Sequence, residues 1–130
     1  MPHGSRTAEV DDTERIPAPD GAYTVFLVPV EMKMSHRLAQ PLIIETATNR
    51  TVLDLTDTSW SADAVRWSDD SVRVTLDMRR YPGDAPGLTA TIDLHMETAA
   101  IASAAESVTV PLGQLARWLE AFYRRHQRGS

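Results

Sequence analysis

Two segments in the second half of the chain alternate between apolar and polar residues with a strict period of two. The first covers residues 72–79 and the second covers residues 88–97. Successive side chains of a β-strand point to opposite faces, so the pattern predicts two strands, each with one face on a core and one in water. Such one-sided burial is typical of antiparallel sheets. The Pro/Gly-rich residues 81–87 are predicted to form the loop between the two strands.

Three further segments are predicted to extend this sheet, although their patterns are weaker. Residues 23–34 carry apolar side chains at most even-numbered positions, beginning at Phe26. We expect this even face to be buried along its length and the odd face to be buried only at its start. Residues 42–44 and 51–55 flank a turn and predict a hairpin. A last strand is predicted around residues 107–110.

The end of the chain carries the clearest helical pattern. Leu112, Leu115, Leu119 and Phe122 recur at spacings of three and four residues, which predicts a helix with one apolar stripe. The alanine-rich residues 98–105 contain one large apolar side chain, and we interpret them as a turn. The predicted fold is therefore α+β, an antiparallel meander of about five or six strands with one C-terminal α-helix packed on its apolar face.

Composition changes once along the chain. Residues 1–20 hold only two large aliphatic side chains other than the first methionine, Val10 and Ile16, among many polar residues and prolines. Such a segment cannot offset its ordering entropy by burial, so we predict a disordered tail over residues 1–20. No second change in composition follows, and residues 21–130 are predicted to form a single α+β domain.

Composition also narrows the class of function. The chain has no cysteine, which excludes disulfides, thiolate metal sites and thiol nucleophiles. A net charge of −5 disfavours binding to nucleic-acid phosphates. No apolar run approaches the roughly 20 residues that span a bilayer, and the first residues lack the apolar core of a signal peptide. We therefore expect a cytoplasmic protein that binds neither nucleic acid nor membranes.

The pairing register of the two alternating strands is restricted, because paired residues must share a face. One allowed register places Asp77 opposite Asp93, and its neighbour places Asp77 opposite Thr91. Directly opposed like charges destabilise a pair of strands, which favours the second register.

The sharpest candidate for chemistry is the sequence Asp93-x-His95-x-Glu97. On a strand, these alternate residues would project to the same side, roughly 7 Å apart along the chain. They could begin a divalent-metal site, or a carboxylate could orient the histidine as a general base. The alternative is that they are the solvated face of an amphipathic strand. No dependable second histidine ligand is found, so we expect no metal site and no cofactor.

Two other arrangements can be drawn from the polar residues. Asp54, Asp77 and Asp93 each lie between two apolar residues, and three neighbouring strands could bring them into one acidic row. The alternative is that arginines nearby form exposed ion pairs with them, which contribute little. Ser103 or Ser107 could join the histidine and Asp93 in a triad, but no Gly-x-Ser-x-Gly turn presents a serine. A phosphate-binding P-loop is also missing from the sequence.

Five residues are candidates for an interaction surface. Trp60 lies in a Ser/Thr/Asp-rich segment and Trp118 lies beside the helix stripe, so either could be an exposed anchor. The alternative is that both pack at the seam between sheet and helix. Arg79, Arg80 and Tyr81 form the one central basic spot of the sequence.

These features predict a small, soluble, non-catalytic domain that binds another protein, as an inhibitor or an immunity-type protein does. The prediction rests mainly on the missing nucleophile turn, phosphate loop and metal ligands, and on the acidic charge, which steers a protein to basic partners. One alternative is a metal-dependent or acid/base enzyme that uses Asp93, His95 and Glu97. A second alternative is a structural protein that forms a homodimer or larger homo-oligomer through an edge strand or the helix.

Overall fold

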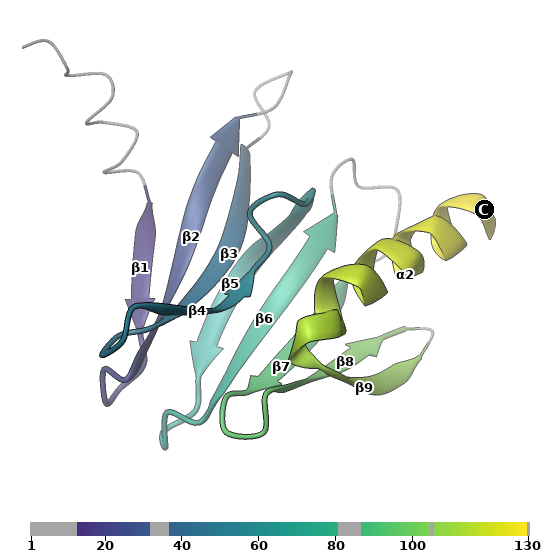
Figure 1. The fold of residues 1–130 in the computed structure, drawn as a ribbon. Coiled ribbons are helices and arrows are strands. Elements are labelled where there is room, and N and C mark those ends of the chain that lie inside the picture. Colours follow the sequence, from purple (N-terminus) through teal and green to yellow (C-terminus); the bar gives the residue numbers. More distant parts are fainter. Residues whose placement is uncertain (1–12, 32–36, 81–86, 105, 130) are drawn as a thin grey trace, which may run out of the picture.

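The computed structural model describes residues 13–31, 37–80, 87–104 and 106–129 of the chain. Its strands form two antiparallel sheets, and a helix near the C-terminus lies across the strands of the second sheet (Figure 1). In each sheet the strands follow one another in the order of the sequence, so both sheets are meanders.

The first sheet, here called sheet A, has four strands in the order β1-β2-β3-β4. A bulge between Ile43 and Ile44 interrupts the pairing of its last two strands. Its first strand lies within residues 1–20, for which a tail was predicted. The half-buried Ile16 in this strand packs against the core, so the folded domain includes residues before Gly21. The strands of sheet A are β1 (Glu14–Pro17), β2 (Tyr23–Glu31), β3 (Arg37–Glu45) and β4 (Arg50–Asp54).

The second sheet, sheet B, has five strands in the order β5-β6-β7-β8-β9. Its inner face is apolar and its outer face is polar, as the alternating segments predict. The segment interpreted as a turn forms β8, in which Ala99 and Ile101 are buried on the inner face. The strands of sheet B are β5 (Trp60–Trp67), β6 (Arg73–Arg80), β7 (Leu88–Asp93), β8 (Thr98–Ser103) and β9 (Ser107–Pro111).

The predicted fold class is confirmed: the chain is α+β, with antiparallel meanders and one C-terminal helix on sheet B. The predicted five or six strands in one sheet are replaced by nine described strands in two sheets. The difference has two physical sources. Short edge strands such as β1 carry few apolar residues, and β8 achieves its burial with alanine side chains, which give little hydrophobic signal.

The helix α2 (Leu115–Gly129) follows a single 3₁₀ turn, η2 (Leu112–Gln114). The predicted stripe is confirmed, because Leu112, Leu115, Leu119 and Phe122 are all buried. They join one core cluster that also includes residues of both sheets, so the described chain has one hydrophobic core. Among the described residues, no helix combines the length and hydropathy needed to cross a bilayer.

Sheets A and B are connected by side-chain hydrogen bonds as well as by the core. The Ala39 amide of β3 donates to the Ser61 hydroxyl oxygen of β5 at 2.9 Å. At the far end of β5, the Trp67 indole nitrogen donates to the Ile16 carbonyl oxygen of β1 at 3.0 Å. Because β5 contacts β3 at its start and β1 at its end, it crosses the inner side of sheet A.

The burial of β2 agrees with the expectation at the start of its odd face and differs from it on the even face. Val25 and Leu27, on the odd face, belong to the core cluster. Phe26, Val28 and Val30, on the even face, are half-buried on the other side of sheet A. Both faces of this strand are apolar, so the period-two pattern does not identify the face that the core covers.

The register of β6 and β7 differs from both predicted registers. Arg73 pairs with Asp93, Thr75 with Thr91, and Asp77 with Thr89. This register still avoids opposed carboxylates, and it places Arg73 within 3.7 Å of Asp93. Opposite charges that face each other across two strands stabilise the pair modestly, whereas the opposed carboxylates of the first predicted register would destabilise it.

Candidate functional site

The three residues Asp93, His95 and Glu97 do not lie on one strand. Asp93 is the last residue of β7, and residues 94–97 form the turn to β8. The Asp93 carboxylate accepts hydrogen bonds from the amides of His95, at 3.0 Å, and Met96, at 2.9 Å. Asp93 therefore closes the turn, as aspartate commonly does at such positions.

The rest of the turn also departs from strand geometry. Leu94 is 3% exposed and Met96 is 71% exposed, although a strand would place both on one face. Glu97 has a φ of 54°, a left-handed conformation. Its carboxylate lies 3.6 Å from Arg50 of β4, and the His95 side chain is exposed. The structure thus does not bring these side chains together as an acid/base or metal-binding group.

The predicted acidic row is not formed either. Asp54 is in sheet A, whereas Asp77 and Asp93 are in sheet B. No group of three His, Cys, Asp or Glu side chains suited to a metal ion occurs among the described residues. Ser103 pairs with Leu88, at the end of β7 opposite to Asp93, and Ser107 pairs with Ala102 at the same end of β8, so neither serine forms a triad with Asp93.

The two tryptophans proposed as anchors are placed differently. Trp60 is 0% exposed at the start of β5, where its ring lies 6.3 Å from that of Phe122. The expectation that it could be exposed is wrong, and it packs at the seam of sheet and helix. Trp118 is half-buried, and its ring stacks on that of Phe122 at 5.2 Å. Trp118 therefore contributes to the helix packing and keeps part of its surface in solvent.

The predicted basic spot is neutralised by acidic neighbours. Arg79 forms an ion pair with Asp63 at 2.8 Å, and Arg80 forms one with Glu120 at 3.2 Å. The Arg80 guanidinium also lies over the Tyr123 ring, 3.7 Å from its centroid. Tyr81 lies outside the described residues.

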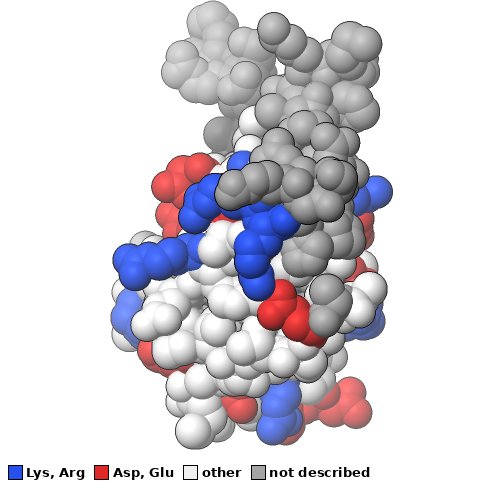
Figure 2. Space-filling view, turned by 90° about the vertical axis from the view of Figure 1, so that its right-hand side faces the viewer, with Lys and Arg blue, Asp and Glu red and all other residues white. Residues whose placement is uncertain are grey.

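The same mixture of charges is seen along the helix side of the molecule. Figure 2 shows a largely uncharged area bordered by both basic and acidic side chains. Arg80 and Arg117 line a depression of about 460 Å³, but Asp57 and Glu120 line it too. Because positive and negative side chains alternate here, this surface has no electrostatic potential of one sign that would attract an anionic ligand.

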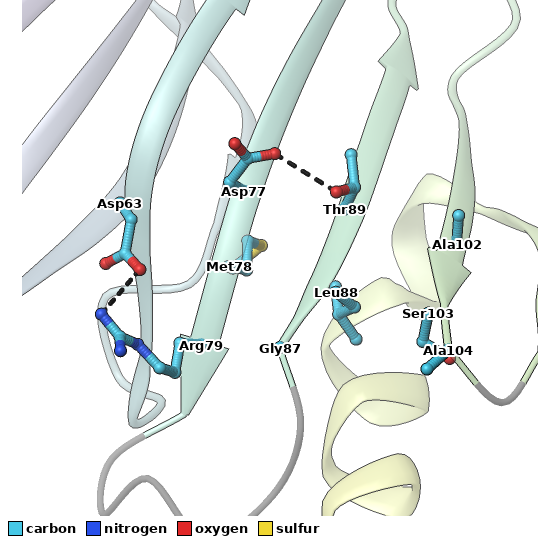
Figure 3. A pocket seen from close by; sticks show the side chains of 10 residues that line it. All are labelled: Asp63, Asp77, Met78, Arg79, Gly87, Leu88, Thr89, Ala102, Ser103 and Ala104. Carbon is cyan, nitrogen blue, oxygen red and sulfur yellow. Dashed lines mark hydrogen bonds and ion pairs between the residues drawn. The ribbon is translucent and has the colours of Figure 1, made fainter.

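A larger depression, of about 560 Å³, lies on the outer face of sheet B (Figure 3). Its carboxylates are already paired: Asp63 with Arg79, and Asp77 with Thr89 and with Arg66. The hydrogen bond from the Arg66 guanidinium, with its charge and the Thr89 hydroxyl, holds the pKa of Asp77 below its ordinary value despite slight desolvation. A carboxyl of this kind stays ionised and is poorly suited to act as a general acid.

Sheet A carries an apolar surface on the side away from the core, and only its β2 part was expected to be buried. Five half-buried side chains lie on its outer face, and none is among the described side chains that pack against the core. We call this surface the outer patch. It consists of Phe26, Val28 and Val30 of β2 and Leu42 and Ile44 of β3. Gln40 and Leu38, which pair with Val28 and Val30 on the same face, are buried, so the face is most open around Phe26 and Leu42.

A charged residue borders the outer patch on each side. The cross-strand pairs Arg15–Phe26, Phe26–Leu42 and Leu42–Asp54 place four residues in one row across the sheet. Paired residues share a face, so Arg15 and Asp54 lie at the two ends of this row. Both are exposed, and the Arg15 guanidinium lies 5.8 Å from the Phe26 ring centroid. The only sequence signal for this surface was that β2 carries apolar residues at both its odd-numbered and its even-numbered positions.

Comparison with known protein families, with curated proteins and with solved structures finds no significant match to this chain.

Proposed function

We propose that this protein is a non-catalytic protein-interaction domain and that the outer patch of sheet A is its contact surface. The observation that carries the proposal is that sheet A has two apolar faces, of which the core covers one. Val25 and Ile43 are fully buried on the inner face, and Phe26 and Leu42 are half-buried on the outer face. Contiguous apolar surface on a folded domain commonly marks a site of interaction.

The shape of the surface fits a protein partner. The patch lies on paired strands of a sheet, and a second sheet or a helix packs about 10 Å from such a face. Apolar area that leaves water there contributes roughly 25 cal/mol per Å² before the costs of association. The exposed charges at Arg15 and Asp54 form a polar rim, which is the arrangement found at protein interfaces.

The enzyme alternative has less support. Asp93, which would have been one of its carboxylates, is hydrogen-bonded to turn amides, and Asp77 is paired with Arg66. The net charge of −5 remains the support for an inhibitor or immunity-type role, because it favours a basic partner.

The proposal is tested by capture from an extract of the source cells. Wild-type protein and the variants Phe26→Ser and Leu42→Ser are immobilised, and retained proteins are identified, purified and titrated against each variant. The matched control is Met96→Ser, which removes the most exposed large apolar side chain among the described residues. We expect each patch variant to bind the purified partner about tenfold more weakly and the control to bind it normally. Equal binding by all variants would contradict the proposal.

A further inference from the structure

We propose that the partner of the outer patch is a second copy of this chain, bound face to face with a two-fold axis that runs along β2 and β3. This inference rests on the proposed function, because it names the partner of the same surface. It is carried by the arrangement of charge across the row Arg15–Phe26–Leu42–Asp54.

The row is complementary to itself. Its order across β1, β2, β3 and β4 is cation, apolar, apolar, anion, with strands about 4.8 Å apart. A two-fold axis parallel to the strands, midway between β2 and β3, exchanges the left and right sides of the sheet. It therefore places Arg15 of one copy over Asp54 of the other, and Phe26 of one over Leu42 of the other. A two-fold symmetric contact repeats each of these pairs twice.

The same charges exclude the competing arrangement. A two-fold axis perpendicular to the strands would keep each residue on its own side of the sheet. Arg15 would then face Arg15 of the second copy, and Asp54 would face its own equivalent. Like charges brought together across an interface oppose association, so charge selects the axis along the strands.

Neither end of the row is neutralised within the described chain. Arg15 makes no ion pair with another described residue, and its guanidinium lies over the Phe26 ring. Asp54 accepts a hydrogen bond from the Thr56 amide at 2.9 Å and has no described cationic partner. By contrast, Asp63, Asp77 and Asp93 on sheet B each lie within 4 Å of an arginine.

The contact is expected to be weak. Four strands span about 14 Å between their axes, and the patch extends roughly 20 Å along β2. This area is a few hundred Å² per copy, below the roughly 800 Å² per partner of a standard interface. Self-association must therefore be followed over protein concentrations from about 1 µM to about 1 mM.

Two charge reversals provide the test. Arg15→Glu alone should place the introduced glutamate over Asp54 at both repeats, and Asp54→Lys alone should place the introduced lysine over Arg15 at both. Each variant should self-associate about tenfold more weakly than the wild type, as measured by sedimentation equilibrium. In a mixture, however, each acidic side chain faces a basic one at both positions. The mixed heterodimer should recover about the wild-type affinity.

The controls carry the same changes of charge elsewhere. Arg124→Glu on α2 and Asp69→Lys in the β5–β6 turn are both at exposed positions. Each should leave self-association within about twofold of the wild type, and their mixture should show no gain. Asp54→Asn keeps an oxygen for the Thr56 amide, so it separates loss of the charge from disturbance of the loop. It should weaken association by a smaller factor than Asp54→Lys. Circular dichroism confirms that each variant is folded.

Three results would overturn the inference. The first is a monomer at every concentration, and the second is a dimer that neither the charge reversals nor Phe26→Ser weaken. The third is a mixture of the two charge-reversal variants that associates no more tightly than each variant alone. If the chain stays monomeric while Phe26→Ser still abolishes binding to an identified foreign protein, only the identity of the partner is wrong. If patch variants change neither self-association nor foreign binding, the proposed function fails as well.

Discussion

The indole nitrogen of Trp67 lies 3.0 Å from the carbonyl oxygen of Ile16, which is 51 residues earlier in the chain. This hydrogen bond joins the last residue of β5 to the first strand of sheet A. A second contact lies beside it, where the Asp20 amide donates to the Ser71 hydroxyl oxygen at 3.0 Å. Together they hold the β5–β6 hairpin against β1 and the turn that follows it.

Replacing Trp67 by phenylalanine should destabilise the protein by about 1–2 kcal/mol, because it removes this hydrogen bond and part of the buried ring. The free energy of unfolding is measured by urea denaturation. Trp118→Phe is the matched control, since Trp118 is also half-buried but its indole nitrogen has no hydrogen bond to a described residue. Equal losses for the two variants would show that the hydrogen bond contributes nothing.

Trp60 leads to a different expectation, because its buried indole nitrogen has no hydrogen-bond partner among the described residues. An unpaired buried donor costs roughly 1–3 kcal/mol. Trp60→Phe removes this unpaired donor. The free energy gained in this way offsets part of the packing that is lost against Phe122. We expect it to cost no more than Trp67→Phe, although Trp60 is the more buried side chain. A larger loss for Trp60→Phe in the same urea measurement contradicts this reasoning.

Asp93 and His95 can be separated by their effects on stability. Asp93→Ala removes the acceptor of two turn amides and should cost about 1 kcal/mol, whereas Asp93→Asn should retain most of the stability. His95→Ala should change the free energy of unfolding by less than about 0.5 kcal/mol, because this side chain is exposed. Thermal unfolding of the three variants provides the comparison. A large loss for His95→Ala would indicate a role that the turn does not explain.

The ion pair of Asp77 and Arg66 predicts a dependence of stability on pH. The pKa of Asp77 is lower in the folded protein than its ordinary value, mainly because the Arg66 guanidinium donates a hydrogen bond to it. The unfolded chain therefore binds this proton more readily. The stabilisation is fully present above the ordinary carboxyl pKa, near 4, and is lost as pH falls through the folded value.

The matching experiment compares the wild type with Asp77→Asn in thermal unfolding between pH 7 and pH 3. The melting temperature of the wild type should be higher at neutral pH, and the difference should shrink as the carboxylate is protonated. Asp69→Asn, an exposed change in the β5–β6 turn that loses no described hydrogen bond, is the control. A difference that stays constant down to pH 3 would contradict the prediction.

Sequence patterns predicted the elements that have one polar, solvent-exposed face. They did not predict burial correctly in elements whose faces are both apolar. The β6 and β7 alternation and the α2 stripe were predictable because polar residues mark their outer sides. Both faces of β2 are apolar, so Phe26 was assigned to the core together with Val25, although only Val25 lies in the core cluster. Trp60 was placed in a loop because serines flank it, whereas long-range packing against the helix buries it.

The candidate site was harder to predict for a related reason. The alternation of β7 continues past Asp93 into residues 94–97, although the strand has already ended there. The hydrogen bonds of Asp93 to the turn amides decide that ending, and no periodic signal reports them. The outer patch is defined by what the core leaves uncovered, which depends on how the two sheets meet. The pairing that creates its row spans four strands and is not encoded in any local motif.

Because both sheets and the helix share a single core, they are expected to unfold together. Val25 of sheet A, Leu76 of sheet B and Phe122 of the helix belong to one cluster, so neither sheet can shed its inner contacts without exposing those of the other. The slowest-exchanging amides of β2 and β6 should therefore open in one concerted event with a common free energy. A fragment that ends before β5 would keep sheet A without the layer that covers it, and its strands would not persist alone.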